Sequence, residues 1–270
     1  MPDGPVLPGG GALNVAWHWQ SLGLPFQLLT RVGDVDAPTF LEMLDRHSID
    51  YGSPEAIVQD GPSASIEIQV LPDREIFMDH YVPGVCEDLR FTADEEHLLA
   101  GATRLHGILV EGVIAELGRL GEAGQLADVE VVADFLGFRH YTPARFADTM
   151  RWVDLAIVGW PGGPGDAGVD ELRRIVEGLG KRLIVTFGSR GVLLFDAPAG
   201  LDRLLAVQHV PVAGTTVGCG DAFIAYLLAE WWATGDLLSA VERGKVGGVL
   251  PTGWFGPLPD EAYGALLRSD

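Results

Sequence analysis

The sequence is short of cysteine and of positive charge. Its 270 residues include two cysteines, Cys86 and Cys219, and no C-x-x-C pair, which excludes a disulfide framework and indicates a reducing compartment. Lysine and arginine together number 18 against 38 acidic residues, so the formal net charge is −20. Such a charge repels nucleic acid and anionic membranes, and we therefore expect neither as a partner.

Long apolar runs and a targeting segment are missing too. No segment is long enough to span a bilayer, and residues 1–5 carry neither a basic region nor an apolar one. We therefore expect a protein of the cytoplasm. Because the chain is acidic, an anionic substrate such as ATP needs a local binding site and metal ions to offset its charge.

Several catalytic motifs are absent. The sequence contains no Walker-type G-x-x-x-x-G-K-[ST] loop, no G-x-S-x-G elbow and no histidines at metal-binding spacing. Gly163–Gly168 matches G-x-G-x-x-G, the pattern of dinucleotide-binding loops. The match lies far from the N-terminus, and no acidic residue closes a strand about 20 residues later. A dinucleotide-dependent oxidoreductase would rest on this pattern alone.

The sequence does have a regular alternation of apolar strands and helices. Helices are predicted at 12–22, where Gly23 ends the first one, and at 38–48. Continuous apolar strands such as Leu155–Val158 are typical of a parallel sheet that is covered on both faces. We predict one α/β domain over residues 1–270. Its strands are expected at 26–32, 105–110, 130–135, 155–159, 183–187, 192–196 and 205–212.

Residues 51–82 depart from this alternation. Ser65–Val70 alternates strictly between apolar and polar side chains, and residues 75–82 can return as a second strand. A lone hairpin cannot bury the apolar face of such a strand, so the sheet is predicted to be a lid over the binding site or a dimer interface. A plain surface hairpin is the alternative. The apolar face consists of Ile66, Ile68 and Val70.

The most distinctive stretch is Gly214–Phe223. Two glycines, Gly218 and Gly220, precede Asp221 and an almost wholly apolar run that predicts a buried helix. The free N–H groups and the dipole at a helix N-terminus make a ready phosphate site. Asp221 would repel a bound phosphate, unless it takes a proton from a hydroxyl that attacks the phosphate. A helix-capping aspartate in an ordinary turn is the alternative.

Two segments resemble the signatures of the PfkB (ribokinase-like) carbohydrate kinases. Gly9–His18, followed by Leu22-Gly23 and Arg31–Asp34, is similar to the N-terminal signature and looks closest to the bacterial fructokinase-type members. Thr216–Phe223 is similar to the second signature. The resemblance extends from about Gly9 to Gly256, nearly the whole chain.

The resemblance implies a three-layer ribokinase-like sandwich with a central, mostly parallel sheet and a small β-sheet lid. It implies ATP-dependent transfer of the γ-phosphate to a hydroxyl of a sugar or sugar-like substrate. Mg²⁺ is the implied metal, and a monovalent cation is a further candidate cofactor. A homodimer through the lid is also expected.

The resemblance assigns site residues by position. Asp221 is the implied general base, and the expected anion hole consists of the N–H groups of Gly218, Cys219 and Gly220. The implied sugar-binding residues are Gly9, Gly10 and Asn14. The implied nucleotide-binding turn contains Thr186, Gly188 and Gly191. Arg139 either meets phosphate or substrate or is a surface arginine.

Three departures from the family pattern bear on these roles. The family usually opens with a strand and a substrate-binding aspartate, whereas only Met1–Pro8 precedes the first glycine motif here. We expect a chain extended upstream by about 20–35 residues to be more stable and to bind sugar more tightly. Gly159–Gly162 replaces the Asn-x-x-Glu motif that organises Mg²⁺, so the metal ligands stay unknown, and Thr215 replaces a usual aspartate. These departures favour the alternative, a kinase-fold protein that binds sugar or nucleotide without catalysis.

Overall fold

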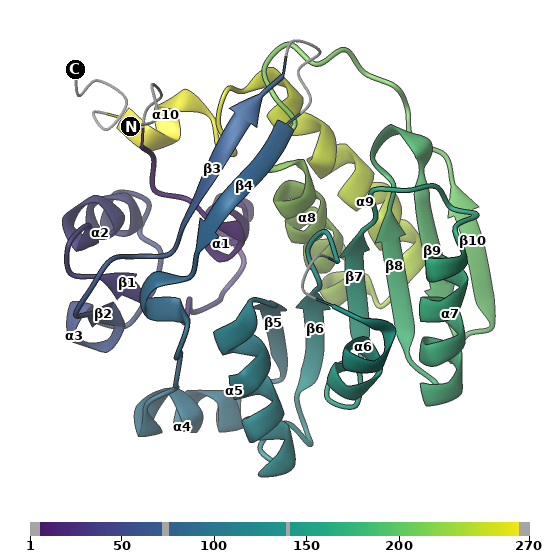
Figure 1. Ribbon diagram of the computed structural model, residues 1–270, viewed down its shortest axis with the longest axis horizontal. Coiled ribbons are helices and arrows are strands. Elements are labelled where there is room, and N and C mark those ends of the chain that lie inside the picture. The colour runs from purple at the N-terminus through teal and green to yellow at the C-terminus, as the bar shows by residue number, and fades with distance from the viewer. Residues whose placement is uncertain (1–5, 72–75, 139–140, 265–270) are drawn as a thin grey trace. The chain divides into compact units, whose positions relative to one another are not determined.

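The chain forms two compact units in the computed structural model, which describes residues 6–71, 76–138 and 141–264 (Figure 1). The first unit contains Met1–Glu87 and Val210–Asp270, and the second contains Asp88–His209. The prediction of a single domain over residues 1–270 stays a prediction.

The second unit contains a six-stranded sheet with the order β10-β9-β8-β7-β6-β5 (Figure 1). Strands β5 to β8 are parallel, and β9 and β10 run antiparallel to their neighbours. This confirms the predicted mostly parallel sheet. The central strands β6, β7 and β8 are almost wholly buried, which explains their continuous apolar sequences. The strand bounds are β5 Arg104–Ile108, β6 Glu130–Asp134, β7 Leu155–Gly159, β8 Arg182–Thr186, β9 Val192–Asp196 and β10 Leu201–Leu205.

Helices α5, α6 and α7 lie along one face of this sheet (Figure 1). On α7 the buried residues Val169, Leu172 and Val176 follow the spacing of an amphipathic helix, and Gly180 ends it in the left-handed conformation. Helix α4 begins with a capping box between Thr92 and Glu95. The helices of this unit are α4 Ala93–Gly101, α5 Glu111–Glu122, α6 Pro143–Thr149 and α7 Ala167–Leu179.

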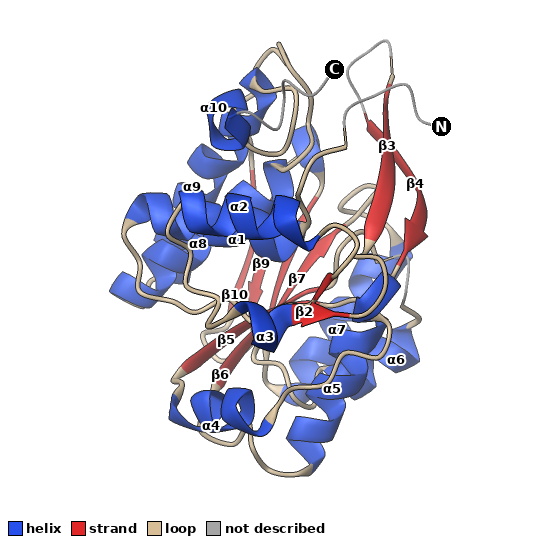
Figure 2. Cartoon of the chain, turned by 90° about the vertical axis from the view of Figure 1, so that its left-hand side faces the viewer, coloured by secondary structure: helices blue, strands red, loops and turns tan. Residues whose placement is uncertain are grey.

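The first unit is mainly helical, and its helices α1, α2, α8 and α9 gather together (Figure 2). Helices α1 and α8 pack against each other, and the Trp19 indole on α1 donates a hydrogen bond of 3.0 Å to the Ala225 carbonyl on α8. Gly23 ends α1 in the left-handed conformation, as predicted. The helices are α1 Gly11–Leu22, α2 Ala37–Arg46, α3 Pro54–Ile57, α8 Cys219–Thr234, α9 Leu237–Val249 and α10 Asp260–Tyr263.

Two predicted strands are wrong. In the segment 26–32 only Val32 enters a strand, the two-residue β1 Val32–Gly33, which pairs in parallel with β2 Val58–Gln59. Residues 206–212 form no strand either. The chain turns instead at residues 197–200, and β10 forms a hairpin with β9 before Pro211, which has no N–H to donate to a ladder.

The predicted lid strands are present as β3 Ser65–Val70 and β4 Ile76–Val82, which form a separate two-stranded antiparallel sheet. Ile66, Ile68 and Val70 are 43%, 39% and 46% exposed. In the single chain, that apolar face is therefore exposed to solvent and accessible to a partner or a ligand. Its pairing with a second subunit and its closure over a sugar stay predictions. None of the described helices is long and apolar enough to cross a membrane.

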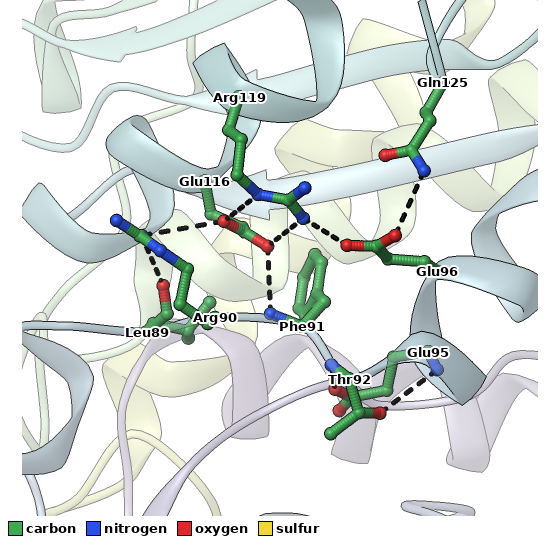
Figure 3. Close-up of polar contacts among 9 residues, drawn as sticks. All are labelled: Leu89, Arg90, Phe91, Thr92, Glu95, Glu96, Glu116, Arg119 and Gln125. Carbon is green, nitrogen blue, oxygen red and sulfur yellow. Dashed lines mark hydrogen bonds and ion pairs between the residues drawn. The ribbon is translucent and has the colours of Figure 1, made fainter. Parts of the chain in front are cut away.

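A buried carboxylate ties α4, α5 and the segment before α4 together (Figure 3). Glu116 on α5 is 1% exposed and accepts hydrogen bonds from the Phe91 N–H at 2.9 Å and from the Arg119 guanidinium at 2.7 and 2.8 Å. Arg119 also pairs with Glu96 on α4. Burial alone would raise the pKa of Glu116, but the hydrogen bonds from Arg119 and Phe91 outweigh it and lower that pKa below its usual value.

We predict that Glu116→Ala lowers the free energy of unfolding by about 2–3 kcal/mol, because it leaves buried donors without their acceptor. Urea denaturation measures the change. Glu122→Ala removes an exposed carboxylate from the same helix and is the matched control, expected to change stability by less than about 0.5 kcal/mol. Equal stability of the two variants would mean that the buried network does not hold these segments.

Candidate active site

Asp221 lies in the first turn of α8, directly after a tight glycine turn. Gly218 is the N-cap of the helix with a φ of 79°, and a Cβ there would lie 2.6 Å from the Pro257 carbonyl oxygen. Both facts require glycine at this position. Gly220 differs, because it is exposed, lies within the helix and would have no atom within 4 Å of its Cβ. The space beside Gly220 is therefore open to a ligand, and no backbone strain demands glycine there.

The loop before α8 is held by Thr215, which is fully buried. Its hydroxyl donates to the Phe255 carbonyl at 3.1 Å and accepts from the Val217 N–H at 3.3 Å. A side-chain oxygen that accepts from the N–H two residues on is the usual device of such turns, and threonine can supply it in place of aspartate. Thr215 therefore has a structural role in the turn.

Only part of the predicted anion hole has free donors. The Cys219 N–H points to the Thr216 carbonyl at 3.3 Å, within the turn. Among the described residues, the N–H groups of Gly218 and Gly220 have no acceptor. These two groups lie at the positive end of the α8 dipole, so they can receive an anion without breaking a protein hydrogen bond.

A residue in the first turn of a second helix, α1, forms a hydrogen bond with Asp221. The Asn14 side chain on α1 is 4% exposed and donates a hydrogen bond of 2.7 Å from Nδ2 to Oδ2 of Asp221. The Oδ1 atom of Asn14 is buried and accepts no hydrogen bond from the described residues. The predicted sugar-binding residue and the predicted base are thus in contact, although 207 positions separate them in the sequence.

The environment of Asp221 favours a proton acceptor. Burial raises the pKa of Asp221 to about 6, and the hydrogen bond from Asn14 opposes that rise. Asp221 accepts from Asn14 and caps no helix, because the N-cap of α8 is Gly218 and makes no side-chain cap. The simple capping role considered above is therefore wrong.

Gly9 and Gly10 precede α1, whose N-cap is Gly10 with a φ of 103°. A Cβ at either position would meet no atom within 4 Å, so the space over this backbone is open. Asn14 follows one turn later, and its N–H donates to the Gly10 carbonyl at 3.0 Å. The structure thus places the predicted sugar-binding residues on a single helix start.

An aromatic group beside Asn14 was missed by the sequence reasoning. His18 lies one helical turn after Asn14, stacks on Trp254 with ring centres 6.2 Å apart, and meets the Tyr226 ring at 5.9 Å. Burial lowers the pKa of His18 to about 4, which keeps it neutral at pH 7. The i, i+4 spacing of Asn14 and His18 on α1 was the one available signal, because it places both on one helix face.

The predicted nucleotide-binding residues form a tight turn in the second unit. Thr186 ends β8, Gly188 begins the short helix η2 Gly188–Arg190, and Gly191 follows that helix before β9. Both glycines have positive φ, 60° and 122°. A Cβ on Gly191 would lie 2.8 Å from the Leu205 carbonyl oxygen, whereas the space beside Gly188 is open. The turn is a shaped backbone surface of the kind that accepts phosphate or ribose.

The segment Gly162–Gly168 packs around Trp160 and Asp166, and close packing requires glycine at its first and last residues. Trp160 donates its indole N–H to Asp166 at 2.9 Å. A Cβ on Gly162 would collide with the Asp166 carboxylate, and one on Gly168 would lie 2.6 Å from the Trp160 ring. Asp166 also accepts from the Gly163 N–H at 3.1 Å. The loop is therefore closed by its own carboxylate, which disfavours a bound pyrophosphate.

The sequence does not identify the residues that would bind a metal ion. Within residues 6–71, 76–138 and 141–264, no group of three or more His, Cys, Asp or Glu side chains could hold a metal ion. Asp134 at the end of β6 is buried, and its Oδ1 accepts from the Leu136 N–H at 2.8 Å. Arg139 lies outside the described residues.

We predict opposite responses from two neighbouring glycines. Gly218→Ala should lower the free energy of unfolding by about 1–3 kcal/mol, because it strains a positive φ and meets Pro257. Gly220→Ala should leave stability unchanged or raise it by up to about 1 kcal/mol, since alanine favours the helix. Thermal and urea denaturation of both variants measure this. A larger loss of stability in Gly220→Ala than in Gly218→Ala would contradict the assignment of the strained backbone to Gly218 and the open space to Gly220.

Known proteins similar to this chain include several kinases, and no family model matches it. It is 26% identical over 240 residues to fructoselysine 6-kinase of Escherichia coli strain K12, which covers 88% of this chain and 87% of that protein. Solved structures that share its fold include two kinases with bound ligands. The nucleoside kinase of Burkholderia thailandensis in complex with inosine matches with a TM-score of 0.72 and 21% identity, over 96% of this chain and 85% of that one. Arabidopsis thaliana ribokinase complexed with ribose and ATP matches with a TM-score of 0.71 and 17% identity, over 98% and 88%. In fold and in sequence, the chain therefore resembles the PfkB (ribokinase-like) kinases, as its two glycine motifs predicted.

Proposed function

We propose that the chain is an ATP-dependent kinase that phosphorylates a hydroxyl of a sugar or sugar-like substrate in the cytoplasm, with Asp221 as the general base. The observation that carries the proposal is the Asp221 carboxylate at the N-terminus of α8, held by Asn14 at 2.7 Å. Burial raises the pKa of Asp221 to about 6, so the group is ionised at pH 7 and still takes up a proton readily.

In the proposed reaction the substrate hydroxyl donates to Asp221. Its oxygen forms a bond to the γ-phosphorus of ATP, the bond from that phosphorus to the β-phosphate oxygen breaks, and ADP leaves. The hydroxyl proton moves to Asp221. The N–H groups of Gly218 and Gly220 stabilise the charge of the transferring phosphoryl group, and that of Cys219 joins them when its turn hydrogen bond opens.

The sugar would bind at the start of α1. The open backbone of Gly9 and Gly10 allows a hydroxyl-rich ligand to come close, and the unsatisfied Oδ1 of Asn14 is an acceptor for a second hydroxyl. Asn14 would then bind substrate and hold Asp221 with one amide group. An amide suits this double task because it has both a donor and an acceptor.

ATP would bind through the turn that contains Thr186, Gly188 and Gly191. The open space at Gly188 and the positive φ of both glycines support this role. ATP is present in the structure of the Arabidopsis ribokinase, a protein of the same fold. Mg²⁺ is expected to enter with the phosphates of ATP and to keep several waters, because the described residues offer no three-residue metal cluster. No step of the proposed reaction depends on a protein-bound metal.

The names of similar proteins support this substrate class. Fructoselysine, inosine and ribose are named for relatives of this chain, and each has a sugar part with free hydroxyls. The alternative is a kinase-fold protein that binds such a ligand without catalysis. Gly159–Gly162, which replaces the Asn-x-x-Glu motif of the family, favours that alternative.

We predict that Asp221→Asn lowers kcat by roughly 10²-fold or more while the protein stays folded, because asparagine cannot accept the proton. ADP release with fructoselysine, ribose, fructose and inosine, each at saturating ATP and Mg²⁺, measures the activity. Sugar and nucleotide binding should be retained within a few-fold.

Asp128→Asn makes the same change at an exposed aspartate and is the matched control, expected to keep the wild-type kcat. Wild-type turnover in Asp221→Asn would remove this residue from the mechanism. Binding of a sugar and ATP with no ADP release from the wild-type protein would support the binding protein instead.

A further inference from the structure

A hollow lies at the amino ends of the sheet strands in the second unit. Its volume is about 370 Å³, within the range of small-molecule pockets. Three connections line it: the one after α5, the one between α6 and β7, and the one between α7 and β8. The turn with Thr186 and Gly188 is at the opposite, carboxyl end of the same parallel strands. The lining residues are Gly121, Gly124, Leu126, Ala127, Val129, Arg151, Trp152, Asp154 and Lys181.

The wall of this hollow is built around Trp152. A Cβ on Gly121 would lie 2.3 Å from the Trp152 ring, so glycine allows the ring to pack directly on α5. The Arg151 guanidinium lies over the ring, 4.9 Å from its centre. This cation–π contact and the packing on Gly121 hold both side chains in place.

The donors of the hollow exceed its acceptors. Asp154 is the one carboxylate in the lining, and both of its oxygens are engaged: Oδ1 accepts from Lys181 Nζ at 2.7 Å, and Oδ2 accepts from the Val131 N–H at 2.9 Å. Among the described residues, the Arg151 guanidinium pairs with no carboxylate. With Arg151 and Lys181 against Asp154, the lining carries a net charge of +1 in a chain of net charge −20.

We propose that this hollow binds a small organic anion, a carboxylate or a phosphate monoester with a compact apolar body. The Arg151 guanidinium would donate to the anionic group, which suits its fork of N–H donors. Leu126, Ala127 and Val129 would cover the apolar body. A site at the amino ends of the strands would leave the turn at their carboxyl ends accessible, so the anion would act as an effector and not as a substrate.

Isothermal titration calorimetry with phenyl phosphate and with phenylacetate tests the site, and phenol is the neutral control. We expect one of the two anions to bind with one-to-one stoichiometry and phenol to bind at least tenfold more weakly. The stronger anion distinguishes a phosphate ligand from a carboxylate ligand. Equal binding of phenol and both anions, or binding of none, would overturn the proposal.

Variants locate the binding. Arg151→Gln should lower the affinity for the anion by about tenfold or more, since it removes a charged hydrogen-bond donor from an exposed position. Ala127→Leu, which fills the hollow, should also lower the affinity for the anion. Arg203→Gln changes an exposed arginine on β10 and is the matched control, expected to leave affinity unchanged.

A further variant separates this hollow from the N-terminus of α8, which also attracts anions. Gly220→Val fills the open space there and should leave the affinity for the probe unchanged. Loss of binding in Gly220→Val together with full binding in Arg151→Gln would assign the anion to α8 and overturn the proposal.

Discussion

The contact between Asn14 and Asp221 is the constraint on which the candidate site depends. One amide joins the first turn of α1 to the first turn of α8, and it does so with a 2.7 Å hydrogen bond to the carboxylate. That hydrogen bond favours the ionised form, while burial favours the neutral one. Because burial prevails, Asp221 is poised to accept a proton near neutral pH, which an exposed aspartate is not.

Close packing behind the two helix starts maintains this contact. Gly218 allows the turn before α8 to lie against Pro257, and Thr215 fixes the same turn to the chain after α9. Trp19 on α1 bonds to the backbone of α8, so the two helices are held in register. The position of the carboxylate thus depends on glycines and hydrogen bonds that never touch a ligand, and this separates the structural glycine Gly218 from the open one, Gly220.

Much of the fold was predictable from local pattern. The bounds of β7 and β9 match the predicted strands because both are apolar and almost fully buried, so their ends coincide with the ends of the apolar runs. The segment 26–32 failed because strand pairing needs a partner, and the sequence does not identify one. The strand predicted at 205–212 lies instead at Leu201–Leu205, as β10. The turn at 197–200, and not the next apolar run, sets the register of the hairpin that β10 forms with β9.

The site could be predicted only as separate pieces. Each glycine motif indicated a helix N-terminus, and both are present. That Asn14 contacts Asp221 could not be inferred, since it depends on how α1 and α8 pack across 207 residues of sequence. The same holds for His18 and Trp254, whose stacking joins the first helix to the C-terminal part of the chain. Gly163–Gly168 matched a motif by composition alone, and its last glycine, Gly168, serves the packing of Trp160.

The most direct test of this account is the titration of the Asp221 carboxyl group by carbon-13 NMR, in the wild-type protein and in Asn14→Ala. We predict a pKa of about 6 for Asp221 in the wild type, raised by burial. We expect a higher pKa in Asn14→Ala, because the lost hydrogen bond favours the ionised form. Ser21→Ala, on the same helix, should leave the titration unchanged. A pKa near the ordinary value for aspartate in both proteins would contradict the central claim that the half-buried, amide-held Asp221 is a base poised near neutral pH.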